Sequence, residues 1–229
     1  LSCKAFIDIL EEAGLPKGWA QVVVPQTIDL ATDLISDPRV AFFSFIGSSR
    51  VGWMLKSKLA SGTRCALEHG GVAPVVVAAD ANLDDVVERV AKGGFYHAGQ
   101  VCVSVQRIFC DKKIVDVFSE KLSAAASQLK VGDPTDLDTD VGPLISEKEC
   151  QRVADWVDEA SKGGAIIKTG GQKISDTCYE PTVLVGADKE AKISASEVFG
   201  PVVSIYPYEN IDDAIAEANS LPVSFQAAV

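Results

Sequence analysis

The sequence predicts an α/β fold with parallel strands, and two observations lead to this prediction. Short apolar segments of strand length alternate with segments of helical periodicity along the 229 residues. One of the apolar segments, residues 40–46, is nearly unbroken, which is typical of a parallel strand buried on both faces and fed by helices. Hydrophobic residues make up 47% of the chain, so a sizeable core is available.

The first third of the chain alternates helix and strand at short intervals. Residues 2–13 carry apolar side chains on one side and are followed by Gly14 and Pro16, which commonly end a helix. A helix at 27–35 opens with Thr27 as a possible N-cap. The remaining elements expected here are strands at 21–24, 40–46 and 63–67, the last ending at Glu68, and a helix at 50–59.

The rest of the chain repeats the mixed pattern. Strands are expected at 75–78, at 107–110 and around Ile166, Val183 and Val203, and helices at 83–93, 114–129, 147–160 and 211–219. Residues 132–142 form a polar loop, and 225–229 read as the start of a further strand. Because the first residues already lie within a helical pattern and no start methionine is present, we expect an excised segment of a longer polypeptide.

Charge and cysteine content exclude several classes of function. The net charge of −11 opposes binding to nucleic acid or anionic lipid, which calls for clustered Lys and Arg. The six cysteines are scattered without a C-x-x-C pair, which favours a reduced, intracellular and cytoplasmic setting. No apolar run reaches the roughly 18 residues of a membrane span, no signal peptide is recognisable, and no His, Cys and Asp spacing indicates a metal.

Cys102 is the predicted nucleophile. It follows Gly99-Gln100-Val101 where a turn leads into an apolar run, and a nest of backbone amides there could lower the pKa of the thiol and stabilise an oxyanion. An isolated cysteine in apolar surroundings is more often part of the core. Glu68 is the predicted general base, because it ends a strand and precedes Gly70-Gly71, where the backbone can pass close to a ligand. Taken without Cys102, it would read as a solvated glutamate in a turn.

Three residues after the strand at 40–46 could meet a phosphate. Gly47, Ser48 and Gly52 open the following helix, so backbone amides and the helix dipole point toward a bound pyrophosphate. The G-x-G-x-x-G fingerprint is absent, so the residues alone are weak evidence for a cofactor site and are equally typical of a tight turn until the resemblance described below is added.

Together these motifs resemble the aldehyde dehydrogenase superfamily over the whole chain. Four of its elements occur in order: Phe45-Ile46-Gly47-Ser48 with Gly52, Glu68-His69-Gly70-Gly71, Gly99-Gln100-Val101-Cys102, and Glu197-Val198-Phe199-Gly200-Pro201. The resemblance implies that NAD or NADP is the cofactor, bound at Gly47, Ser48 and Gly52. It further implies that Glu197 hydrogen-bonds the nicotinamide ribose while Phe199 packs beside it. It also implies a partial dinucleotide-binding domain over 1–70, Rossmann-like and with a parallel sheet, an α/β catalytic domain over 71–229 truncated at its C-terminus, and a homo-oligomeric parent.

The reaction implied by the resemblance is the oxidation of a small-molecule aldehyde to a carboxylate. Cys102 would form a thiohemiacetal and then a thioester, which water activated by Glu68 would hydrolyse. Two alternatives stay open: a CoA-acylating enzyme, against which Glu68 argues, and a non-catalytic fragment or assembly element. The excised chain alone is expected to have little or no activity.

Overall fold

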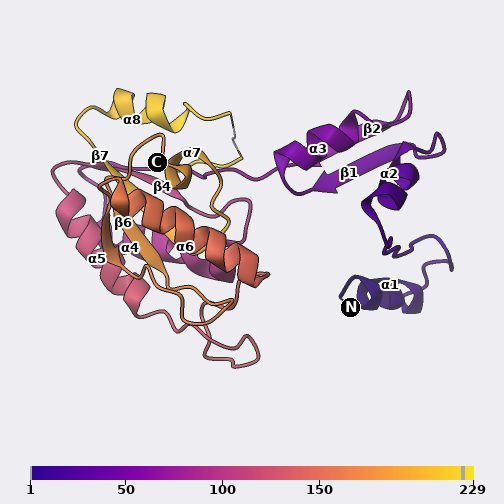
Figure 1. Ribbon diagram of the computed structural model, residues 1–229, viewed down its shortest axis with the longest axis horizontal. Coiled ribbons are helices and arrows are strands. Elements are labelled where there is room, and N and C mark those ends of the chain that lie inside the picture. The colour runs from indigo at the N-terminus through magenta and orange to yellow at the C-terminus, as the bar shows by residue number, and fades with distance from the viewer. Residues whose placement is uncertain (1, 223–224) are drawn as a thin grey trace. The chain divides into compact units, whose positions relative to one another are not determined.

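The computed structural model describes residues 2–222 and 225–229 and has the predicted mixed α/β class with parallel strands (Figure 1). The chain folds into two compact units, Leu1–Glu68 and His69–Val229. The sequence places a boundary near residue 70. The assignment of cofactor binding to one side of it and catalysis to the other stays a prediction.

The first unit holds a two-stranded parallel sheet and three helices. Its elements in order are α1 (Ser2–Glu12), α2 (Ile28–Ser36), β1 (Phe42–Ile46), α3 (Ser49–Lys56) and β2 (Arg64–Glu68). Thr27 caps α2 as predicted, since its Oγ1 accepts a hydrogen bond from the Leu30 N–H at 3.3 Å. The strands pair in register from Phe42 opposite Arg64 to Ile46 opposite Glu68.

Two predictions for this unit are wrong. Residues 21–24 form no strand in the described part of the chain, because β1 and β2 pair with each other and the valines at 22–24 are exposed without a ladder partner. Strand β1 is also not buried on both faces: Phe43 is buried, but Phe42 and Ile46 are exposed. A sheet of two strands with few covering helices cannot bury both of its faces.

The second unit contains a five-stranded sheet in the order β3-β4-β7-β6-β5. The strands are β3 (Val75–Val77), β4 (Arg107–Asp111), β5 (Ile166–Thr169), β6 (Thr182–Val185) and β7 (Val202–Tyr208). All neighbours pair in parallel except β5, which is antiparallel to β6. Ala228 forms an isolated parallel bridge with Val75, so the predicted terminal strand is limited here to one pairing position.

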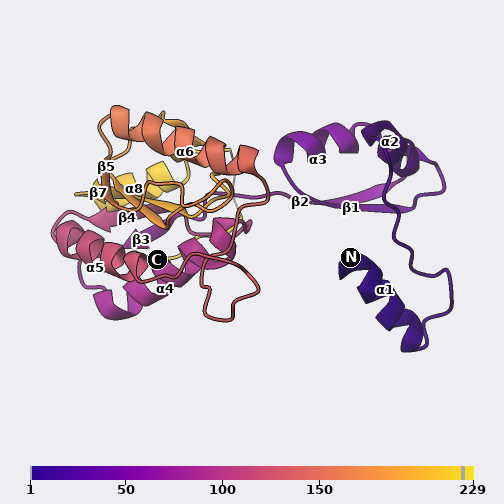
Figure 2. The same ribbon diagram turned by 60° about the horizontal axis from the view of Figure 1, so that its bottom comes forward.

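Helices cover both faces of this sheet. They are α4 (Leu83–Phe95), the 3₁₀ turn η1 (Tyr96–Gly99), α5 (Val115–Ser127), α6 (Glu147–Lys162), the short α7 (Lys192–Ala195) and α8 (Ile211–Ala218). Figure 2 shows α4 and α5 below the sheet and α6 above it. Apolar residues of the strands and helices make one continuous core, with β4, β6 and β7 at its centre. Within the described part of the chain, no helix is long and apolar enough to cross a bilayer.

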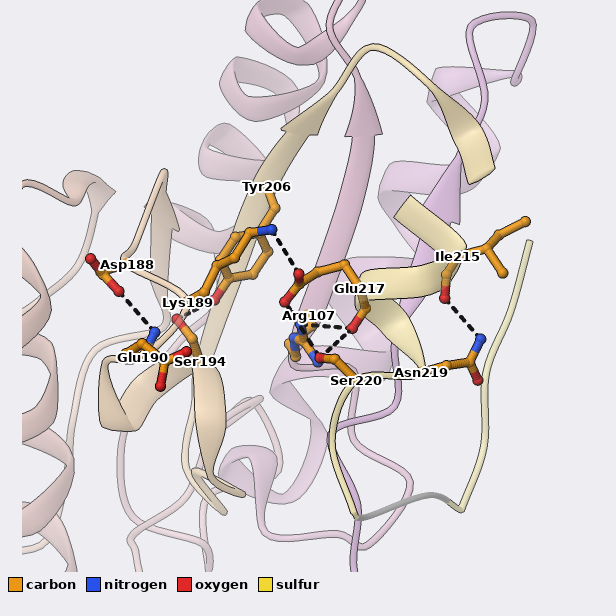
Figure 3. A network of polar contacts seen from close by, with 10 residues as sticks. All are labelled: Arg107, Asp188, Lys189, Glu190, Ser194, Tyr206, Ile215, Glu217, Asn219 and Ser220. Carbon is orange, nitrogen blue, oxygen red and sulfur yellow. Dashed lines mark hydrogen bonds and ion pairs between the residues drawn. The ribbon is translucent and has the colours of Figure 1, made fainter. Parts of the chain in front are cut away.

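Helix α8 is held to the sheet by the buried guanidinium of Arg107 (Figure 3). The Nη2 atom of Arg107, a residue only 2% exposed, donates to Glu217 Oε1 at 2.9 Å and to the Glu217 carbonyl at 3.1 Å. Lys189 donates to the other carboxylate oxygen at 2.7 Å, and the rings of Phe109 and Tyr206 flank the guanidinium. The positive charge of Arg107, which β4 places in the core, is therefore paired with the carboxylate of Glu217.

Candidate active site

Cys102 lies in a turn between η1 and β4, and its thiol is free and half-buried. The turn is closed by the Ser104 N–H, which donates to the Val101 carbonyl at 3.0 Å. Directly before it the backbone is left-handed at three successive residues: His97 (φ 50°), Ala98 (φ 56°) and Gly99 (φ 68°). Such a conformation costs about 1–2 kcal/mol for each non-glycine residue and tends to occur at functional sites.

Gln100 ties this turn to a distant loop. Its Nε2 donates to the carbonyl oxygens of His97 and Pro143, both at 3.2 Å, and its Oε1 accepts from the Ile145 N–H at 2.9 Å. The glutamine of the Gly-Gln-x-Cys motif therefore holds the approach to Cys102 against the loop at 143–145. The motif identifies Gln100 from the sequence, but its partners Pro143 and Ile145, more than 40 positions away, cannot be identified from the sequence.

An open groove of about 1080 Å³ runs along this region. Tyr96, His97, Val101 and Phe199 line it together with residues of the loop from Pro134 to Ile145. Val101, which directly precedes Cys102, is one of these lining residues, so a small organic molecule bound in the groove would lie close to the turn that carries Cys102.

The Glu-x-Phe-Gly-Pro element lies directly against the Gly-Gln-x-Cys element. A Cβ atom built on Gly99 would lie 2.0 Å from the Gly200 carbonyl oxygen, so these two backbones approach each other as closely as glycine allows. Phe199 has a positive φ of 48° and an exposed ring. The structure thus brings Cys102 and Phe199, two residues that the sequence predicts as part of one site, onto contacting segments.

Glu197 meets the Gly70-Gly71 pair within the same unit. A Cβ on Gly70 would lie 1.7 Å from Glu197 Oε1, so the carboxylate lies directly against the backbone of Gly70 and would have to shift if a larger residue stood there. Burial raises the pKa of the Glu197 carboxyl above its usual value, while the Gly71 N–H and the Arg152 guanidinium oppose the rise. Among the described residues, Oε1 is buried without a hydrogen-bond partner, which leaves it able to accept a donor from a ligand.

Two residues without a role in the sequence prediction hold the segment that carries Glu197. The buried carboxamide of Gln106 accepts from the Val198 N–H at 2.8 Å, and Arg152 donates to the Val198 carbonyl at 2.7 Å. Both backbone groups of Val198 are therefore satisfied by side chains. The sequence signal for Gln106 is weak: it is one polar residue next to an apolar strand.

The other predicted residues gather at one edge of the first unit. Gly47 follows β1 with a φ of 155°, and its N–H donates to the Glu68 carbonyl at 3.2 Å. Ser48 precedes α3, and Gly52 is buried in the first turn of that helix. Glu68 ends β2 opposite Ile46, with an exposed side chain. Gly47, Ser48 and Glu68 thus share the carboxyl edge of the two strands, whereas the approach of Glu68 to Cys102 stays a prediction.

Within residues 2–222 and 225–229, no three His, Cys, Asp or Glu side chains gather as metal ligands.

Comparison with known proteins gives one consistent result. The family model described as "Aldehyde dehydrogenase family" matches residues 1–229. The chain is 39% identical over 222 residues to 3-sulfolactaldehyde dehydrogenase of Priestia aryabhattai, which covers 97% of this chain and 46% of that protein. An NADP-dependent enzyme of E. coli superimposes with a TM-score of 0.93 at 34% identity, covering 97% of this chain and 47% of the other. The NAD-dependent aldehyde dehydrogenase of Sinorhizobium meliloti superimposes with a TM-score of 0.91 at 34% identity, covering 96% of this chain and 44% of the other. The chain thus spans about half the length of these relatives.

Proposed function

This chain belongs to the aldehyde dehydrogenase family, and we propose that the full-length protein oxidises an aldehyde to a carboxylate with NAD or NADP. The observation that carries the proposal is the contact between the turn of Cys102 and the segment of Glu197 and Phe199, made through Gly99 and Gly200. A thiol nucleophile and a carboxylate with an unpaired buried oxygen then lie on adjoining segments of one unit. We further propose that the full-length protein is a cytoplasmic homo-oligomer, with six free thiols that fit a reducing compartment.

Cys102 is the nucleophile in this proposal. Its Sγ atom adds to the carbonyl carbon of an aldehyde in the groove beside Val101 and Phe199 to give a thiohemiacetal. Loss of a hydride from that carbon, and of the hydroxyl proton to water, leaves a thioester on Cys102. The rigid turn supports this role, because Gln100 and the left-handed residues before it fix the backbone from which the thiol projects.

The residues present fit a dinucleotide. Glu197 Oε1 has no donor among the described residues, and a ribose hydroxyl would supply one. The turn of Gly47 and Ser48 at the start of α3 offers backbone amides to a pyrophosphate. When bound, NAD or NADP would accept the hydride. The relatives include both an NAD-dependent and an NADP-dependent enzyme, and the proposal covers both.

Glu68 is the base of the last step in this proposal. Its carboxylate takes a proton from the water that attacks the thioester, which frees the carboxylic acid and restores Cys102. Its place at the end of β2, two positions before the glycine pair that contacts Glu197, supports the role.

Substitutions of Cys102 and Glu68 in the full-length protein test the function, with a substitution of Cys178 as the control. Cys102→Ser is expected to lower the rate of nicotinamide reduction by at least about 1000-fold, whereas Cys178→Ser, a substitution at another half-buried free thiol, should leave it within about twofold. Glu68→Gln should retain a rapid burst of reduced nicotinamide and slow the steady state, because the amide cannot take a proton from water. Unchanged turnover in Cys102→Ser would refute the proposal, and loss of the burst in Glu68→Gln would give Glu68 another step.

The 229-residue chain alone is expected to bind dinucleotide weakly and to show little activity. Productive geometry tolerates errors of only a few tenths of an ångström, and small misplacements can cost about 100-fold. Calorimetric titration of the chain with NAD and with NADP measures this directly. A low-micromolar dissociation constant would contradict the expectation.

A further inference from the structure

The carboxamide of Gln106 forms a buried hydrogen-bonded clamp on the segment before Phe199. The residue is 4% exposed and lies four positions after Cys102, immediately before β4. Its Nε2 donates to the Ile193 carbonyl at 3.1 Å and to the Ser196 carbonyl at 2.7 Å. Its Oε1 accepts from the Val198 N–H at 2.8 Å. One side chain therefore binds three backbone groups, two before Glu197 and one after it.

The clamp is also anchored at its own backbone. The Gln106 carbonyl accepts from the Ser204 N–H of β7 at 2.8 Å, which fixes the residue to the centre of the sheet. Gln106 is thus linked to Cys102, four positions earlier in the chain, and it contacts both neighbours of Glu197, Ser196 and Val198. The segment it holds has no long helix or strand of its own, since α7 ends at Ala195 and β7 begins at Val202.

We propose that Gln106 is a positioning residue, which fixes Glu197 and Phe199 in the place where they contact the ribose side of the dinucleotide relative to Cys102. The inference rests on the proposed function, because it concerns how the same site is held. Glu197 lies between two backbone groups that Gln106 binds, so loss of the carboxamide releases the carboxylate from both sides. The thiol is fixed independently, through the Ser104 N–H and the contacts of Gln100.

The test compares three variants of the full-length protein. Gln106→Met keeps the length and volume of the side chain and removes all three hydrogen bonds. Gln106→Glu keeps the acceptor for the Val198 N–H and removes the two donors. Tyr206→Phe is the matched control: it removes the 2.6 Å hydrogen bond from Tyr206 Oη to Ser194 Oγ, which holds the same segment at α7, and leaves the contacts of Gln106 in place.

We expect Gln106→Met to raise the KM for dinucleotide about 10-fold, because small displacements of binding groups cost this much or more. The Val198 amide should exchange its hydrogen faster, while the rate at which iodoacetamide alkylates Cys102 should stay within about twofold. The KM of the Gln106→Glu protein should lie between those of the Gln106→Met protein and the unmodified protein. Tyr206→Phe should leave the KM unchanged. A general loss of packing would instead change alkylation and KM together.

An unchanged KM in a folded Gln106→Met protein overturns the inference, as does an alkylation rate that changes as much as the KM. If Gln106→Met does not fold, the same two outcomes in the Gln106→Glu protein, an unchanged KM or an alkylation rate that changes as much as the KM, overturn the inference. An unmodified full-length protein that neither binds nor reduces a dinucleotide refutes the proposed function itself. An active protein whose KM for dinucleotide does not change on substitution of Gln106 refutes only the role of Gln106.

Discussion

The thiols of this chain differ in surroundings that bear on their reactivity. Burial raises the pKa of Cys110 to about 12 and also raises the pKa of the Cys150 thiol. The reactive form of a cysteine is the thiolate, so these two side chains are inert near neutral pH. Cys102 is only half-buried, and its neighbour Val101 lines an open groove.

Brief treatment of the full-length protein with limiting iodoacetamide should therefore label Cys102 well before Cys110 and Cys150. Mass mapping of the modified peptides gives the order of labelling, and the same treatment after denaturation serves as the control, since all six thiols should then react at similar rates. Labelling of Cys65, Cys110 or Cys150 ahead of Cys102 would contradict the assignment of the nucleophile.

The carboxyl group of Glu197, which is part of the predicted site, also affects the stability of the fold. Because burial raises the pKa of its carboxyl in the folded state above the unfolded value of 4.5, the charged form destabilises the fold. The destabilisation is absent well below pH 4.5, where the carboxyl is protonated in both states, and it grows as the pH rises above that value. Glu197→Gln removes the charge and should raise the thermal midpoint by about 1–3 °C near pH 7.

That gain should disappear as the pH is lowered toward 4. Thermal scans of both proteins from pH 4 to pH 8 measure it, with Glu209→Gln as the control. Glu209 lies on the surface and pairs with Lys112, which lowers the pKa of its carboxyl, so its replacement should not stabilise the fold at neutral pH. A Glu197→Gln gain that is independent of pH would show that packing, rather than charge, is responsible.

At the scale of elements, close contacts between glycines position the site. Gly99 is left-handed, and a Cβ there would lie 2.0 Å from the Gly200 carbonyl oxygen and 3.1 Å from the Pro201 nitrogen. These are backbone atoms, which cannot rotate away as a side chain does. The turn of Cys102 and the segment of Glu197 can therefore stay together only if this residue is glycine.

Gly99→Ala should lower the free energy of unfolding by about 2–4 kcal/mol, from a left-handed alanine and a backbone clash together. Gly164→Ala is the matched control, because Gly164 also has a positive φ, 104°, but nothing lies within 4 Å of its Cβ position. Its expected cost is about 1 kcal/mol. Chemical denaturation measures both values, and equal losses would show that the contact with Gly200 is unimportant.

The same scale shows what sequence patterns can and cannot reveal. The long elements α4, α5, α6 and α8 and the strands around Val183 and Val203 follow from apolar periodicity and lie within a few residues of their predicted places. The short helix α7, the left-handed turn at His97 and the clamp of Gln106 do not follow from it. Each depends on contacts between distant residues, such as the 92 positions that separate Gln106 from Val198. The predicted strand at 21–24 fails for the same reason, since a strand needs a partner that composition does not supply.

For the molecule as a whole, the two units differ in how much apolar surface they bury. In the described part of Leu1–Glu68, Phe43 and Gly52 are the buried residues, and α1 and α2 contain none. The second unit has a continuous core around its five-stranded sheet. A two-stranded sheet without a covered face is marginal in water, whereas a sheet packed on both faces unfolds cooperatively.

Limited proteolysis of the 229-residue chain with trypsin should therefore cut first within residues 1–68 and leave a stable product that begins near residue 69. Suitable exposed sites include Arg39, Lys56 and Lys58. Lys112 and Lys162 serve as internal controls, because they are equally exposed but lie beside or within elements that pack on the core of the second unit. Mass spectrometry over a time course gives the order of cuts, and hydrogen exchange should show faster exchange in β1 and β2 than in β4 and β7. An early cut at Lys112 or Lys162, or equal protection of the two sheets, would contradict the expected difference in stability.

If the difference is found, the turn of Gly47 and Ser48 belongs to the less stable unit. A dinucleotide that binds at this turn must then order that unit, which lowers its affinity.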